Sequence, residues 1–299
     1  MPAFLDITIP LLTFLIMFTV GTDLVLTDLK RVARTPGTVV QASLAQIVCL
    51  PLVGLTVVNL LPLDDSVAVG VLLIAACPGG SISNFYIYLA RANVALSVVL
   101  TGISCLLATL TMPLVLAGFE RYMSGSGSFH VPFVKLLSTL ILFQLLPIIL
   151  GMLLRHMRPD LILRYDRWIR CGSLVLLTGM VIQVLYQAPV GVMQDLPQIV
   201  MASALMALLA ILAGFLVGRV MKLEAYDFWP LVVELMVQNI ALASTIAVTV
   251  LNQARFASFA AIYLLVQVPF AAILALACLR VQAGRSQGKA VRLQHPQKS

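Results

Sequence analysis

One acidic side chain lies deep within a hydrophobic stretch of the sequence. Of the twelve acidic residues, Glu234 is the only one deep in a hydrophobic span, with Val232-Val233 before it and Leu235-Met236-Val237 after it. A charge in the middle of a membrane span costs about 2.5–3.5 kcal/mol, so such a residue usually marks a functional site. Gln238 follows four residues later and would share a helix face with Glu234. The alternatives are a cation site, a proton site, or a structural role for a neutral, hydrogen-bonded carboxyl group.

Further oxygen-bearing side chains occur at comparable depth in apolar segments. With Glu234 they form the set Gln46, Asn84, Ser97, Thr101, Glu234 and Gln238. Carboxylate and amide oxygens are ligands of hard cations, and the set lacks the soft ligands that many transition metals select. It therefore favours a hard cation. For Ser97 and Thr101 a structural role is the alternative, because hydroxyls in membrane helices often bond to the carbonyl four residues earlier.

The composition places these residues within a membrane. Of the 299 residues, 61% are hydrophobic and 10% are charged, and the mean hydropathy is +1.05. These values exclude a soluble domain of this length. Segments of about 20 predominantly apolar residues are long enough to span a bilayer as helices, and the sequence contains nine of them. We therefore expect an all-α polytopic membrane protein with nine transmembrane helices.

Two of the nine predicted spans contain an interruption. The first holds Cys77-Pro78-Gly79-Gly80-Ser81-Ile82-Ser83-Asn84, and the second holds residues Glu234 to Asn239. Proline removes a hydrogen-bond donor and glycine permits unwinding. Irregular backbone survives at membrane depth only where it is buried in protein or lines a polar cavity. A proline-kinked packing helix would explain the first segment alone, but two interruptions in corresponding places favour paired discontinuous helices, as in transporters built from inverted repeats.

The basic residues predict the orientation. Sixteen of the nineteen fall on one side of the nine-span topology, which predicts an outside N-terminus and a cytoplasmic C-terminus in the cell (inner) membrane. They form no continuous face, so nucleic acid is not an expected partner. We expect one transmembrane domain over residues 1–282, with repeats at 1–122 and 133–282 around a Gly/Ser connector at 124–128. Residues 283–299 are expected to form a disordered basic tail.

The chain resembles the bile acid:sodium symporter family over nearly its whole length. Residues 77–84, continuing through Tyr88-Leu89-Ala90-Arg91-Ala92-Asn93-Val94-Ala95-Leu96-Ser97, resemble the first crossover segment of that family. Residues 234–239 resemble the second. The resemblance implies a core domain around two crossing discontinuous helices and a panel domain against which the core moves to give alternating access.

The resemblance also implies two sodium ions behind the crossover. The first ion would be held by Ser83, Asn84, Ser97, Thr101 and Glu234. The second would be held by the side chains of Gln46, Gln238 and Glu234 and by the backbone oxygens of Leu235 and Val237. A small organic anion would lie in front of the crossover, near Ser81 and Asn239.

Three features depart from the family pattern. Bacterial members often have a further N-terminal span, whereas nine spans are expected here, as in the animal members. The family commonly has glycine two residues after the glutamate, where this chain has Met236. It also commonly follows Gln-Asn with Ser-Gly-Leu-Ala, where this chain has Ile240-Ala241-Leu242-Ala243. These departures bear on whether the second segment unwinds and on its contact with substrate.

These observations predict a secondary active transporter that couples sodium to uptake of an organic anion, either bile acid-like or another small organic acid, by alternating access. A proton-coupled transporter using Glu234, or a non-concentrating channel or ligand sensor, is the alternative. An enzyme is not expected, because metalloprotease and hydrolase motifs are missing from the spans and the three histidines lie in loops or at ends. Sodium ions, substrate and the lipid bilayer are the expected partners, and no protein partner is indicated.

Overall fold

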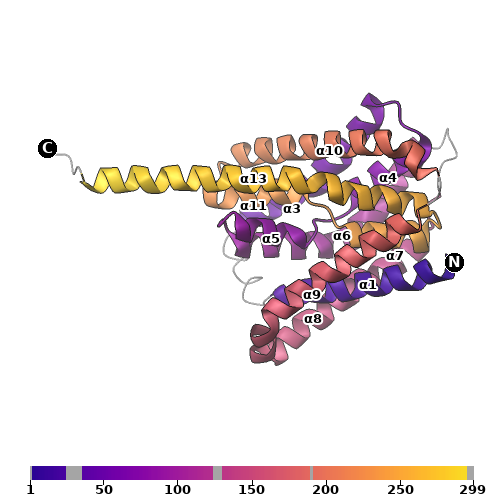
Figure 1. Cartoon of the computed structure of the whole chain (residues 1–299), viewed down its shortest axis with the longest axis horizontal. Helices are drawn as coiled ribbons and strands as arrows, with labels where there is room; N and C mark the ends of the chain where they lie inside the picture. Colours follow the sequence, from indigo (N-terminus) through magenta and orange to yellow (C-terminus); the bar gives the residue numbers. More distant parts are fainter. Residues whose placement is uncertain (1, 25–35, 124–129, 189–190, 295–299) are drawn as a thin grey trace.

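The computed structural model describes residues 2–24, 36–123, 130–188 and 191–294 (Figure 1). Within these ranges the fold is helical throughout, and one isolated β-bridge is the single extended pairing. The helices are α1 (Pro2–Asp23), α3 (Pro36–Leu60), α4 (Asp65–Ala76), α5 (Ile82–Leu89), α6 (Val94–Tyr122), α7 (Phe133–Leu140), α8 (Leu146–Met157), α9 (Pro159–Tyr186), α10 (Val192–Val220), α11 (Ala225–Met236), α12 (Ile240–Thr245) and α13 (Ala254–Gln294). Two π-helical segments, η1 (Ile141–Leu145) and η2 (Ile246–Val250), join α7 to α8 and extend α12.

Seven helical stretches in the described residues are long and apolar enough to cross a membrane. They lie in α1, α3, α6, the continuous α7–η1–α8, α9, α10 and α13. The prediction of an all-α polytopic membrane protein is therefore confirmed. The remaining apolar helices are short and occur where the sequence predicts interrupted spans.

Both predicted interruptions are present, and both are shorter than expected. In the first, α4 ends at Ala76 and α5 begins at Ile82; in the second, α11 ends at Met236 and α12 begins at Ile240. Ser83 and Asn84 are therefore in the first turn of α5, and Glu234 is in the last turn of α11. A helix end leaves its first amides and last carbonyls without helical partners, so the residues at each break need hydrogen-bond partners elsewhere.

The two breaks supply those partners to each other. Gly79 and Gln238 form an antiparallel bridge. The Gly80 amide donates to the Val237 carbonyl at 2.9 Å, and the Asn239 amide donates to the Pro78 carbonyl at 2.9 Å. A β-carbon on Gly80 would lie 2.5 Å from the Gln238 carbonyl oxygen. Glycine therefore allows the two backbones to approach closely enough for these hydrogen bonds.

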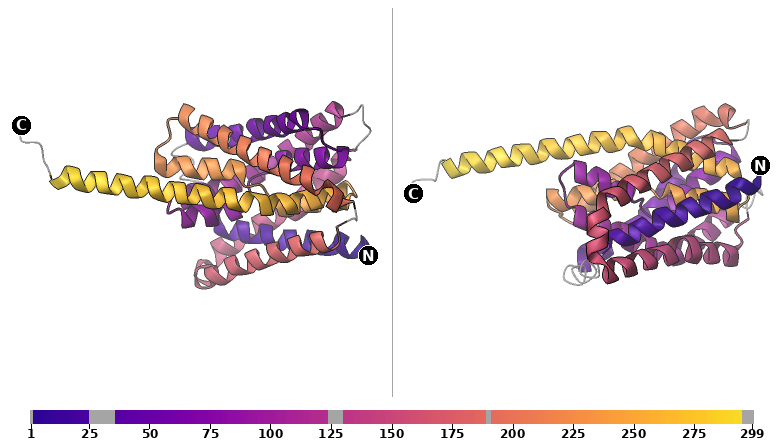
Figure 2. Two further views of the ribbon diagram at one scale, coloured as in Figure 1. Left: turned by 45° about the horizontal axis from the view of Figure 1, so that its top comes forward. Right: turned by 60° about the horizontal axis from the view of Figure 1, so that its bottom comes forward.

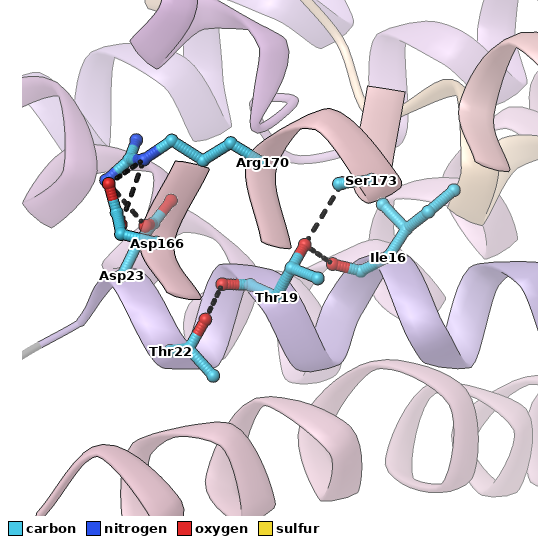
Figure 3. A network of polar contacts seen from close by, with 7 residues as sticks. All are labelled: Ile16, Thr19, Thr22, Asp23, Asp166, Arg170 and Ser173. Carbon is cyan, nitrogen blue, oxygen red and sulfur yellow. Dashed lines mark hydrogen bonds and ion pairs between the residues drawn. The ribbon is translucent and has the colours of Figure 1, made fainter. Parts of the chain in front are cut away.

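Helices α1, α8 and α9 lie side by side along one edge of the molecule (Figures 1 and 2). A β-carbon on Gly151 of α8 would lie 2.3 Å from the Phe18 carbonyl of α1, so these two helices pack with their backbones in close contact. Figure 3 shows how α1 is tied to α9: Arg170 pairs with Asp23 at 2.9 Å, and Thr19 donates to Ser173 at 3.0 Å.

The end of the chain differs from the expectation. We expected residues 283–299 to be disordered, but α13 continues through Gln294 and extends beyond the other helices (Figure 2). The sequence has no proline between Pro269 and Pro296, so nothing in this stretch forces the helix to stop. Residues 295–299 and the predicted connector at 124–128 lie outside the described residues.

Candidate cation site at the paired helix breaks

Glu234 is the centre of a buried polar cluster beside the two breaks. Its side chain is 1% exposed. Its Oε2 atom accepts hydrogen bonds from Ser83 Oγ of α5 at 2.7 Å and from Thr101 Oγ1 of α6 at 3.0 Å. One carboxyl group thus connects α5, α6 and α11, although its two hydrogen-bond partners are neutral hydroxyls that bring no compensating charge.

The other carboxyl oxygen, Glu234 Oε1, has no hydrogen-bond partner. It faces Gly79, where an added β-carbon would clash with it and would lie 3.1 Å from Gln46 Nε2. Gln46 Nε2 is also buried without a partner. Exchange of the two ends of an amide is compatible with the same side-chain position, so Gln46 can present its oxygen here. The missing side chain of Gly79 therefore allows the Glu234 carboxyl group and the Gln46 amide to lie close to this backbone.

Three further buried oxygens near this centre lack partners. They are Asn84 Oδ1, Ser97 Oγ and Gln238 Oε1. Leaving a buried polar atom unpaired costs about 1–3 kcal/mol, and several such acceptors close to a carboxyl group carry that cost together. A hard cation pairs with carboxylate, amide and hydroxyl oxygens at once. The donor set of this cluster therefore fits a sodium ion as a transported substrate.

Thr101 combines the two roles that its sequence position allows. Its Oγ1 lies 3.1 Å from the Ser97 carbonyl four residues earlier and 3.0 Å from Glu234 Oε2. A hydroxyl has one proton to donate, so it serves one of these acceptors at a time. Ser97 Oγ makes no bond to the carbonyl four residues before it. A purely structural role for the hydroxyl therefore suits Thr101 better than Ser97.

The backbone oxygens of the predicted second sodium site already accept hydrogen bonds. The Leu235 carbonyl accepts from Gln238 Nε2 at 2.6 Å, and the Val237 carbonyl accepts from the Gly80 amide at 2.9 Å. A carbonyl oxygen has two lone pairs, so each retains one position for a cation. Gln238 is oriented by the first of these bonds.

The predicted substrate residues lie on the two sides of the bridge between the breaks. Ser81 is partly exposed and directly precedes α5, whereas Asn239 is 3% exposed and caps α12. Asn239 Oδ1 accepts from the Leu242 amide at 3.1 Å, and Asn239 Nδ2 donates to Met17 Sδ of α1 at 3.4 Å. Asn239 thus connects the second break to α1.

A small cavity adjoins the first break. It has a volume of about 20 Å³ and is lined by Cys77 and Pro78 of the break and by residues of α3, α4 and α6, including Gln46 and Ser104. This volume accommodates one water-sized occupant. Gln46 thus lines the cavity and also approaches Gly79, against which the Glu234 carboxyl group packs.

Sequence reasoning missed the polar groups through which α1 contacts the second break. Thr13 Oγ1 donates to the Ala241 carbonyl at 2.9 Å and accepts from Thr245 Oγ1 at 2.8 Å. It also missed Gln144, which is completely buried. A lone amide inside an apolar span was the signal used for Gln46, and the same signal would have found Gln144.

The fold and this site define a class of membrane protein. Discontinuous helices that meet within a helical bundle beside a buried carboxyl group are typical of secondary transporters. The sequence comparisons give the family. The model described as "Sodium Bile acid symporter family" matches residues 10–194, and the chain belongs to that family.

Individual relatives agree with this assignment. The chain is 30% identical to the "Uncharacterized sodium-dependent transporter YocS" of Bacillus subtilis (strain 168) over 235 residues, 78% of this chain and 71% of the relative. It is 29% identical to the human "Ileal sodium/bile acid cotransporter" over 278 residues, 90% and 78% of the two chains. A match of 29% to the "Probable sodium/metabolite cotransporter BASS1, chloroplastic" of Arabidopsis thaliana covers 77% of this chain but only 56% of that relative. These relatives are named as transporters, not as enzymes.

Proposed function

We propose that the protein imports an organic anion together with sodium and that Glu234 is shared between two sodium sites. The observation that carries this proposal is the cluster of buried, unpaired oxygens around Glu234, namely Asn84 Oδ1, Ser97 Oγ, Gln238 Oε1 and Glu234 Oε1 itself. The family and the names of the relatives support sodium as the coupling ion.

The first sodium site is proposed to lie between α5, α6 and α11. Its ligands are Ser83, Asn84, Ser97, Thr101 and Glu234. The bonds from Ser83 and Thr101 to Glu234 support this grouping, because they bring three of the five ligands into contact. Sodium there compensates the carboxylate charge.

The second sodium site is proposed to lie beside the bridge between the breaks. Its ligands are the side chains of Gln46, Gln238 and Glu234 and the backbone oxygens of Leu235 and Val237. The close approach of Glu234 Oε1 and the Gln46 amide to Gly79 supports this assignment. Binding of an ion there would hold the two breaks in register, which would link sodium occupancy to the shape of the substrate site near Ser81 and Asn239.

Alternating access is proposed as movement of a panel of α1, α7, α8 and α9 against a core that contains the two breaks. The close packing of α1 with α8 and the ion pair between α1 and α9 support the panel as one unit. If each broken pair counts as one span, the fold has nine spans and an inverted repeat with α7–η1–α8 unpaired. The basic residues support an outside N-terminus and a cytoplasmic C-terminus in the cell membrane.

Proton coupling through Glu234 is the second candidate. It is favoured by the two hydroxyl partners of the carboxyl group, which also suit a protonated form. It predicts uptake that depends on pH and not on sodium. A channel or sensor would bind its ligand without concentrating it, so uptake against a gradient in proteoliposomes separates it from both transport mechanisms.

The deciding experiment measures thermal stability of the purified protein in sodium, potassium and choline chloride at equal ionic strength. Ligands that bind the folded state raise the melting temperature, so we expect a rise in sodium alone. Glu234→Gln should remove that rise, and Lys135→Gln, at an exposed position far from the site in sequence, should retain it. A melting temperature that is the same in all three salts would refute sodium binding.

A further inference from the structure

Two deeply buried polar side chains line the cavity beside the first break. Gln46 of α3 and Ser104 of α6 are each 5% exposed, and both border the volume of about 20 Å³. Ala75 and Ala76, at the end of α4, line it as well. A cavity of this size holds one water molecule, provided that two to four polar groups are present to bind it. Two side chains and the end of a helix supply that number.

The amide of Gln46 has neighbours on two sides. It approaches Gly79, against which Glu234 Oε1 packs, and it also lines the cavity. Gln46 Nε2 has no hydrogen-bond partner in the described residues. If the amide oxygen faces the carboxyl group, as a shared cation requires, the NH₂ group points in a different direction and needs an acceptor of its own. The cavity is where such an acceptor can be provided.

Ser104 is equipped to accept a hydrogen bond in the cavity. Its Oγ donates its single proton to the Thr101 carbonyl at 2.9 Å, which leaves the lone pairs of the hydroxyl oxygen for other donors. The last carbonyls of a helix such as α4 also lack helical donors. A water molecule can therefore accept from the Gln46 amide and donate to two oxygens of this lining.

We propose that Ser104 is a positioning residue for sodium. Through one water molecule in this cavity, it holds the NH₂ group of Gln46 and so directs the Gln46 oxygen toward the second ion. The water accepts from the amide and donates to Ser104 Oγ and to a carbonyl at the end of α4. Groups behind a metal ligand commonly fix its orientation in this way. This inference rests on the proposed function and adds a residue that contacts no ion.

The test measures the sodium concentration that gives half of the maximal rise in melting temperature of the purified full chain, with choline as the replacing cation. Ser104→Ala removes the acceptor, and we expect this concentration to increase about threefold to tenfold, the range of one hydrogen bond. Ala108→Val adds two methyl groups to the lining of the same cavity. It should give a similar increase, because it excludes the water while the Ser104 hydroxyl remains.

Loss of the bond to Thr101 is the rival explanation for an effect of Ser104→Ala, because Thr101 is a ligand of the proposed first site. A double-mutant cycle separates the two routes. In a Gln46→Met background no amide is left to orient, so Ser104→Ala should change the half-maximal sodium concentration less than about twofold. An equal change with glutamine and methionine at this position would assign the effect to Thr101 and overturn the inference. If Gln46→Met abolishes the response, Ala108→Val decides, since it leaves the bond to Thr101 intact.

Ser258→Ala is the matched control. Ser258 on α13 is also buried and also donates to a carbonyl of its own helix, at 3.2 Å, but it does not line the cavity. It should leave the sodium titration unchanged. An equal loss in this control, or an unchanged titration of either Ser104→Ala or Ala108→Val, would overturn the inference. If the wild type shows no rise in sodium, the proposed function fails; if the rise is present and indifferent to Ser104, only this inference fails.

Discussion

The two helix breaks reach the same pairing with different residues. The first contains Pro78, Gly79 and Gly80, whereas the second, Val237-Gln238-Asn239, contains no glycine. Val237 and Asn239 have φ values of −92° and −81°, which any residue adopts. Neither Gly79 nor Gly80 has a left-handed φ. The glycines are therefore required for the space that they leave, and one break can supply that space for both.

This difference explains how the second break forms although Met236 replaces the glycine that is common in the family. The family commonly has glycine where this chain has Met236, yet the chain unwinds directly after this residue. Met236 is completely buried and remains the last residue of α11, and its carbonyl accepts from Tyr263 Oη at 2.7 Å. Contacts of the neighbouring helix thus fix the end of α11 without glycine.

The largest effect is expected from introducing the family's glycine at the second break. Met236→Gly removes a completely buried side chain and adds a flexible residue to the last turn of α11. We expect a loss of about 3–5 kcal/mol in unfolding free energy, measured as a lower melting temperature or denaturant midpoint. Met236→Leu should cost less than about 1.5 kcal/mol. Equal or higher stability of the glycine variant would show that the second break needs the flexibility.

A side chain at the first break should have the next largest effect. The β-carbon of Gly80→Ala would lie 2.5 Å from the Gln238 carbonyl oxygen, a backbone atom that cannot move away by rotation. Overpacking of this kind costs about 1–3 kcal/mol. Gly118→Ala in α6 is the control, since its β-carbon would have no neighbour within 4 Å. Similar melting temperatures for the two variants would contradict the close-approach explanation.

Gly79→Ala should affect sodium more than stability. The nearest obstacle to its β-carbon is the end of the Glu234 side chain, which can move. Movement would displace Oε1 from the proposed second ion, so we expect the sodium dependence of the melting temperature to shift to at least tenfold higher concentration, about 1.4 kcal/mol in binding free energy. An unchanged sodium titration would exclude Gly79 as the residue that shapes this site.

The smallest effect concerns the helix cap of the second break. Asn239→Ala removes the bond to the Leu242 amide, which should cost about 1 kcal/mol of stability. Asn239→Ser retains a capping oxygen and should restore most of it. If serine is no better than alanine in thermal melts, the contact with Met17 and not the cap accounts for the loss.

The sequence predicted the positions of both breaks because proline, paired glycines and a lone carboxyl group are strong local signals. The resemblance to a family placed Ser83 and Glu234 among the ligands of one sodium ion, which stays a prediction, and the two side chains are hydrogen-bonded to each other. The sequence overestimated the length of the breaks, because the residue types do not show how far the backbone hydrogen bonds of a helix continue. The helical end of α13 was predicted wrongly from its charged composition, which does not distinguish a disordered tail from a solvated helix.

The contacts of α1 with the second break could not be predicted. Thr13 and Met17 belong to an ordinary apolar span, and periodicity does not reveal which neighbour a given helix face meets. Gln144 was within reach of the reasoning applied to Gln46, but its hydrogen bond to the Cys105 carbonyl joins two residues that are distant in the chain and meet only on folding.

The hydrogen bonds between the breaks have a consequence for biogenesis. The amide of Gly80 and the carbonyl of Pro78 find their partners at Val237 and Asn239, which a ribosome produces long after the first break has left it. Until then, the earlier segment carries exposed peptide groups that lipid cannot solvate. The N-terminal half must therefore wait near the translocon or in contact with water, and its final insertion into lipid follows synthesis of the C-terminal half.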